Sequence, residues 1–180
     1  MSQLDRLKQS YTQHVRLPWQ RGLAPAQKVW FVVYDEGDER RLRLRLGEFQ
    51  IVTRDAGHGW RHVDLTDIFP EWMASNSYRE SYFKSPKLLT GPALGAFKSF
   101  VVDRVRETLS APDTTDETVV ALTGVASLFG LLRVSGLVEA VHGEIRGRLV
   151  VFFPGAYRNN TYRLLDRRDG WDYLAVPLTE

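Results

Sequence analysis

The sequence predicts a single α/β domain over residues 1–180, with a mostly parallel, doubly wound sheet of about five strands flanked by helices. Two observations favour this fold. Short apolar runs of strand length alternate with segments of helical periodicity, and the connections between the runs are long. Parallel strands need such connections, and right-handed crossovers are expected. We expect a P-loop-like topology without a phosphate loop.

The N-terminal part is expected to contribute one helix and one central strand. Apolar side chains at helical spacing predict an amphipathic helix over 3–15 that packs on the domain. Residues 29–34 form an uncharged run of β-branched and aromatic side chains. Such a run is typical of a strand that is buried on both faces, which favours a central position in a parallel sheet.

The segment 38–56 fits two structures. Residues 41–46 alternate Arg and Leu as a strand would, and 36–38 could form the turn of a hairpin. The segment also carries a helical stripe, with Gly57 placed as a C-terminal cap. We favour the helix, because a strand with several Arg on one face would have to lie at a sheet edge. The stripe consists of Leu42, Leu46, Phe49 and Val52.

The middle of the chain predicts a second strand and two helices. The strand covers 61–65, and Thr66 or Asp67 can cap a helix over 67–82. A long apolar stripe predicts the second helix over 92–110.

The C-terminal part predicts three more strands and one helix. The third strand, 118–122, leads through a Thr-Gly turn into a helix with an apolar stripe over 128–141. The fourth strand, 148–153, is expected to stop at Pro154-Gly155. The last strand is placed at 171–177.

Composition limits the class of protein. The formal net charge is only +2, which gives little steering toward nucleic acid. There is no cysteine, so disulfides and thiolate metal sites are excluded. No apolar stretch is long enough to cross a membrane, and the N-terminus lacks the layout of a secretion signal. We therefore expect a soluble, cytoplasmic protein.

Carboxylates follow two predicted strands. Asp35 and Asp64 stand where sites occur in such sheets, and two carboxylates at neighbouring strand ends could hold Mg²⁺. Both residues are equally suited to cap or turn the chain after a strand. We favour the structural role, because no phosphate-binding group accompanies them.

A turn and helix start after the third strand offers a weak anion site. Its candidates are Thr123, Gly124 and Ser127, since backbone amides at a helix start attract anions. The turn lacks the lysine and the spacing of a phosphate loop. Nucleotide hydrolysis is therefore not expected, and a structural turn explains the residues equally well.

The histidines do not predict a zinc site. His58 and His62 are four residues apart, but the glycines around His58 argue against a helix there. In a strand the two side chains would be roughly 13 Å apart by rise alone. No nucleophile elbow occurs in the sequence. We therefore expect no catalytic residue, no metal and no cofactor.

Two arginine clusters and several aromatic residues are candidates for partner binding. Basic residues interleaved with aromatic ones can bind nucleic acid, whereas the acidic residues among them favour a solvated or protein-binding face. Trp19, Trp72, Tyr78, Tyr82 and Phe83 could anchor a partner or belong to the core. The arginines are Arg40, Arg41, Arg43, Arg158 and Arg163.

The ordered set of C-terminal segments resembles the BrxB family, small proteins of the bacterial BREX (bacteriophage exclusion) systems. N-terminal stretches within 16–60 are also similar to the family. The strongest resemblance lies in Thr118–Gly130, Arg133–Glu139, Gly147–Gly155, Asn159–Asp166 and Trp171–Pro177.

The resemblance implies a non-catalytic component of a phage-defence assembly. It implies association with other BREX proteins, of which PglZ is the most plausible, and it supplies no catalytic residues. The leading hypothesis is therefore an adaptor. The alternatives are a degenerate P-loop-like protein that binds nucleotide or phosphate near Thr123, and a subunit that contacts DNA through the arginine clusters.

Overall fold

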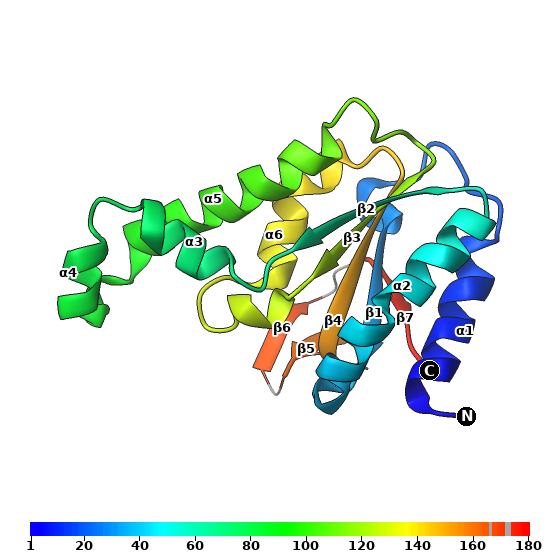
Figure 1. Ribbon diagram of the computed structural model, residues 1–180, viewed down its shortest axis with the longest axis horizontal. Coiled ribbons are helices and arrows are strands. Elements are labelled where there is room, and N and C mark those ends of the chain that lie inside the picture. The colour runs from blue at the N-terminus through cyan, green and yellow to red at the C-terminus, as the bar shows by residue number, and fades with distance from the viewer. Residues whose placement is uncertain (166, 172–173) are drawn as a thin grey trace.

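The computed structural model describes residues 1–165, 167–171 and 174–180, with the backbone alone at 167–171. Helices and strands alternate through most of the chain (Figure 1). The helices are α1 (Gln3–Val15), α2 (Glu39–Asp55), α3 (Ile68–Ser75), α4 (Arg79–Lys84), α5 (Gly91–Leu109) and α6 (Val134–Val141). The strands are β1 (Val29–Tyr34), β2 (Gly59–Asp64), β3 (Thr118–Thr123), β4 (Arg148–Arg158), β5 (Thr161–Leu164), β6 (Arg167–Trp171) and β7 (Val176–Leu178).

A parallel sheet forms the centre, in the order β2-β3-β4-β1-β7. The register places Val29 beside Leu149 and Val32 beside Phe152. Beyond its parallel stretch, β4 pairs antiparallel with β5, which in turn pairs with β6. The predicted parallel α/β sheet is confirmed, and the antiparallel pair β5–β6 extends it.

Helices cover both faces of the sheet (Figure 1). On one face, α1 and α2 pack against alternate residues of β1 and β4, including Trp30 and Phe152. On the other face, α3, α5 and α6 pack against the intervening residues, including Phe31 and Phe153. All six residues of β1 are buried, as expected for a strand between two neighbours. The sheet is therefore doubly wound.

The structure settles the alternative at residues 38–56 in favour of the helix. Leu42 and Phe49 of α2 are buried on the sheet, while most of the arginines point outward. Gly57 follows the helix with a φ of 89°, the left-handed conformation of a C-terminal cap. No helix among the described residues has both the length and the apolar character needed to cross a lipid bilayer.

The predicted helix 67–82 is wrong as a single element. It is divided into α3 and α4, because Asn76 adopts an extended conformation with φ −87° and ψ 127°. The side-chain oxygen of Asn76 accepts a hydrogen bond from the amide of Tyr78 at 2.8 Å. This local bond competes with helical pairing and redirects the chain.

The helix expected directly after Gly124 is also wrong. A short 3₁₀ turn, Val125–Leu128, comes first, and α6 begins only at Val134. Gly130, with a φ of 78°, lies in the intervening segment. A left-handed residue cannot continue a right-handed helix, so the apolar residues before it pack on the core from a loop.

Pro154-Gly155 does not end the fourth strand. β4 continues to Arg158, because Gly155 pairs with Leu164 of β5. A Cβ atom on Gly155 would collide with the carbonyl oxygen of Arg163, so glycine permits this close pairing. The last predicted strand, 171–177, is wrong as one element: β6 ends at Trp171, β7 begins at Val176, and residues 172–173 lie outside the described residues.

Candidate functional site

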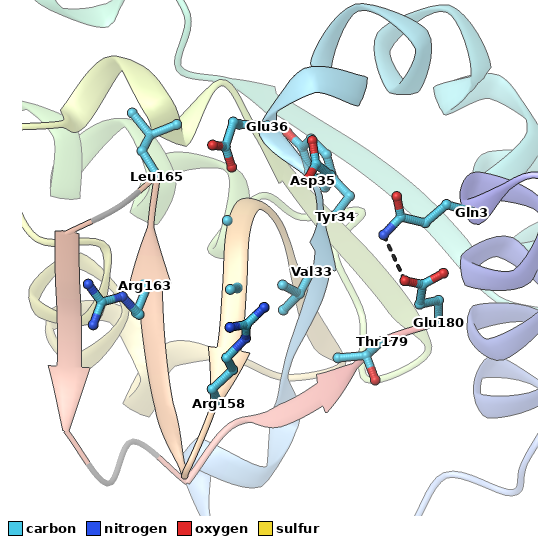
Figure 2. Close-up of a pocket in the computed structure, with 12 residues that line it drawn as sticks. Gln3, Val33, Tyr34, Asp35, Glu36, Arg158, Arg163, Leu165, Thr179 and Glu180 are labelled. Atoms are coloured by element: carbon cyan, nitrogen blue, oxygen red, sulfur yellow. Dashed lines mark hydrogen bonds between the residues drawn. The ribbon is translucent and has the colours of Figure 1, made fainter.

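A cavity of about 410 Å³ opens at the carboxyl ends of β1 and β4 (Figure 2). These neighbouring strands mark the point where the sheet order reverses, because the chain runs from β1 through α2 to β2 at one side of the sheet and from β4 toward β7 at the other. Open α/β sheets place ligands in the crevice at this point. The cavity is therefore the first place to look for a binding site.

Charges of both signs line this switch-point cavity. Asp35 and Glu36 follow β1, Arg158 ends β4, and Arg163 lies on β5 (Figure 2). Glu180 closes one side, held by hydrogen bonds from Gln3 at 2.9 Å and Arg6 at 2.5 Å. Among the described residues, no group of three His, Cys, Asp or Glu side chains is placed to hold a metal ion.

The loop after β1 occupies the place of a phosphate loop in a P-loop-like topology. Here that loop carries Asp35, Glu36 and Asp38. The amide of Gly37 donates to Oδ1 of Asp35 at 2.8 Å, so a carboxylate takes the bond that a phosphate would accept. The predicted topology is confirmed, and the acidic loop disfavours a phosphate at this position.

Thr123 and Gly124 form a tight turn against the end of β2. Gly124 has a φ of 73°, and a Cβ atom there would lie 2.7 Å from Oδ1 of Asp64. Thr123 shares a 2.7 Å hydrogen bond with Nε2 of His62, and the amide of Ser127 donates to the carbonyl of Gly124 at 3.0 Å. The carboxylate beside the turn works against the weak anion site predicted here.

The two carboxylates considered for magnesium do not lie at neighbouring strand ends. Asp35 follows β1 and Asp64 ends β2, with β3 and β4 between them. Asp64 accepts hydrogen bonds from the amide and hydroxyl of Thr66, at 2.9 Å and 2.5 Å. It therefore serves the turn after β2, and the premise of the magnesium site was wrong.

A polar network joins α2 to the sheet beside a small cavity of about 140 Å³. The hydroxyl of Tyr34 donates to Glu39, and Arg43 donates to Glu39 at 2.7 Å and to Thr66 at 2.8 Å. Burial and the bond to Glu39 raise the pKa of Tyr34, so its hydroxyl remains a donor at neutral pH. Sequence reasoning named Arg43 but missed Tyr34 and Glu39, because neither residue belongs to a recognisable sequence motif.

The two arginine clusters occupy different surroundings. On α2, Arg41 is paired with Asp38 at 3.1 Å, and Arg43 with Glu39 at 2.7 Å, while Arg40 is exposed. Arg158 and Arg163 lie instead at the switch-point cavity. The two clusters therefore lie on different elements, one on α2 and the other on β4 and β5.

Trp19 lies near the amino-terminal ends of the strands, at the opposite end of the sheet from the switch-point cavity. Its neighbours come from several parts of the chain. The ring of His58 stacks on it with 3.6 Å between centroids. The guanidinium of Arg148 lies over the Trp19 ring, 4.6 Å from its centroid. Trp30 contacts it edge to face. The candidate zinc ligand His58 lies 2.9 Å from a carboxylate oxygen of Glu117.

The other aromatic candidates divide by exposure. Trp72 is buried in the core at 5% exposure, and Tyr82 is half-buried beside it. Tyr78 and Phe83 are 66% and 65% exposed. They lie at the tip of a helical arm, residues 68–100, in which α4 projects farthest from the sheet (Figure 1). A groove of about 630 Å³ runs between α3 and α5 within this arm.

Comparison with known proteins supplies the family. A family model described as BREX protein BrxB matches residues 62–178, well over half of the chain. The match includes the helical arm and the C-terminal segments that carry the resemblance, whereas the similar stretches within 16–60 lie outside it. No curated protein and no solved structure matches the chain. The chain therefore belongs to the BrxB family and is a component of a BREX phage-defence system.

Proposed function

We propose that the protein is a non-catalytic adaptor of its BREX system and that the helical arm is its docking surface. The observation that carries this proposal is the exposure of large apolar side chains at the tip of the arm. Tyr78, Phe83 and Leu88 are 66%, 65% and 51% exposed. Exposed aromatic side chains gathered on one element are typical of interaction sites.

The arm also offers a receiving surface. Its groove is lined by Tyr82 and Phe100 and by small side chains of α5, including Ala96. Trp72 also lines the groove and packs against both Tyr82 and Phe97, which ties this part of the groove to the core. A groove of mixed aromatic and polar lining beside exposed aromatic residues suits an amphipathic helix or loop of a partner.

The charge around the arm favours an acidic partner surface. Basic residues outnumber acidic ones on α4 and the turn that follows it: Arg79, Lys84 and Lys87 are exposed there, against Glu80, which lies 4.0 Å from Arg79. Such rim charges steer association and set specificity more than they add affinity. We infer that the partner is another BREX protein, with PglZ as the first candidate, and that it presents apolar side chains within an acidic rim.

Co-elution of the purified protein with purified PglZ, and with each other BREX protein in turn, tests this proposal. We expect a stable complex with one of them. Replacing Phe83 and Tyr78 together by Ser should weaken that complex about tenfold or more, because each contact of this kind contributes roughly 1–2 kcal/mol.

Leu44→Ser is the matched control, since Leu44 is 81% exposed on α2, away from the arm. It should leave the affinity unchanged. Equal binding by all variants would show that the arm is not the interface. Failure of the wild-type protein to bind any BREX component would remove the adaptor role.

A further inference from the structure

A second cavity, of about 180 Å³, lies at the amino-terminal ends of the parallel strands, opposite the switch-point cavity at their carboxyl ends. It is formed where β1, β3 and β4 begin. Lys28 directly precedes β1, Glu117 precedes β3, and Arg148 opens β4. The segment after α1 closes it with Trp19 and Arg21.

The described side chains that line the cavity carry more positive than negative charge. In the part of the chain that the structure describes, no carboxylate lies within ion-pair distance of Lys28, Arg146 or Arg148. Their hydrogen bonds go to backbone carbonyls instead: Lys28 donates to Ile145 at 3.1 Å, and Arg146 to Thr114 at 2.7 Å. A carbonyl accepts a hydrogen bond but carries no full charge to offset the cation.

Each of the two carboxylates at the cavity already has a side-chain partner. Asp116 pairs with Arg21 at 3.4 Å, and Glu117 lies 2.9 Å from His58. The described lining therefore comprises four cations, Lys28, Arg21, Arg146 and Arg148, against two carboxylates.

Arg148 is the buried centre of this cluster. It is only 5% exposed, and its Nε has no hydrogen-bond partner among the described residues. Its terminal nitrogens donate to the carbonyls of Gly147 at 2.9 Å and Gln20 at 3.4 Å, which leaves guanidinium donors unused. Burial lowers the pKa of Arg148, although Glu117 acts in the opposite direction. An under-compensated buried cation is costly unless a counter-charge reaches it.

The aromatic residues hold this guanidinium in place. Arg148 lies 4.6 Å from the ring centroid of Trp19 and 5.8 Å from that of Trp30. His58 stacks on Trp19 and fixes the orientation of its indole. The geometry therefore preorganises Arg148 for one ligand position, which reduces the entropy lost on binding.

We propose that this cavity is a binding site for a small oxyanion of the phosphate class, held by Arg148, Arg146 and Lys28. Arginine forks and a lysine point charge together match the geometry of phosphate oxygens. The volume suits a single anionic group and not a whole nucleotide. This site is independent of the helical arm, so it can stand or fall without the adaptor role.

Titration calorimetry with inorganic phosphate, at ionic strength kept constant with chloride, tests the site. We expect saturable binding of one phosphate per chain. Arg146→Gln, at an exposed position, should weaken it about tenfold, as expected for loss of one charge-assisted contact. Arg40→Gln makes the same charge change on α2 and should leave binding unaltered. Equal weakening by both variants would reveal only a general charge effect and would overturn the proposal.

A second arm of the experiment identifies the form of the ligand. Glycerol phosphate that binds as tightly as inorganic phosphate would indicate a site open to a phosphate carried on a larger molecule. Binding of inorganic phosphate alone would indicate a closed site for the free ion. Absence of saturable binding of either compound at millimolar concentration, in protein whose circular dichroism shows it folded, would remove the site.

Discussion

The hydroxyl of Tyr11 in α1 lies 2.6 Å from that of Thr53 in α2, and both residues have no exposed surface. Thr53 donates its own proton to the carbonyl of Phe49 at 2.7 Å, so Tyr11 must be the donor between the two hydroxyls. This pair fixes the two helices on the same face of the sheet relative to each other.

The direction of that bond predicts unequal effects of its two deletions. Tyr11→Phe removes a donor and leaves Thr53 bonded to Phe49, so it should cost about 1 kcal/mol of the free energy of unfolding. Thr53→Val leaves the buried Tyr11 hydroxyl without an acceptor and should cost more, up to about 3 kcal/mol. Urea denaturation of both variants measures the difference. Equal losses would contradict the assigned direction.

Gly124 predicts a strong and local sensitivity. Gly124→Ala should destabilise the fold by about 1–3 kcal/mol or more, because alanine resists a positive φ and its Cβ would press on Asp64 and Thr66. Gly47→Ala is the control: Gly47 is exposed inside α2, with open space around its Cβ position. That change should stabilise the protein by roughly 0.5–1 kcal/mol. Thermal unfolding of the two variants should move in opposite directions.

An ion network between α1 and α2 predicts an acid-sensitive contribution to stability. Hydrogen bonds from Arg45 and Lys8 lower the pKa of Glu48 to about 2, from an ordinary value of 4.5. Because the folded-state pKa is depressed, the stabilisation is fully present above about pH 4.5. It is lost as the pH falls from there toward 2.

Glu48→Gln isolates this contribution. The variant should be less stable than the wild type at neutral pH, and the difference should shrink as the pH falls from 4.5 toward 2. Urea denaturation across this range measures it, with Glu107→Gln as a control at a carboxylate on α5. A stability difference that stays constant with pH would exclude a role for the ionised Glu48 carboxylate.

Sequence periodicity predicted the elements whose burial follows a regular pattern. The bounds of α1 and β1 match the prediction, since one buried stripe and one uncharged run define them. The divided helix at Asn76 and the continuation of β4 through Gly155 were missed for different reasons. The first depends on one side-chain hydrogen bond, and the second on pairing with a strand that comes later in the chain.

The cavity around Arg148 was also beyond sequence reasoning. Trp19, His58 and Arg148 are far apart in the chain and none belongs to a motif. They meet because the parallel sheet places the first residues of β1, β3 and β4 at the same end of the sheet. By contrast, Tyr78 and Phe83 were named from the sequence among five aromatic residues that could anchor a partner or belong to the core. Their exposure, and the burial of Trp72 from the same set, depended on the division of the predicted helix at Asn76.

The position of β1 has a consequence for how the chain is made. Its partners are β4 and β7, which are synthesised much later. Val29 can pair with Leu149, and Trp30 with Val176, only after those residues have been made. While the ribosome synthesises the intervening chain, this apolar strand has neither neighbour, and its backbone and side chains remain open to wrong pairing. We expect newly made chains to depend on chaperones until β4 emerges, and the arrival of that strand to set the pace of productive folding.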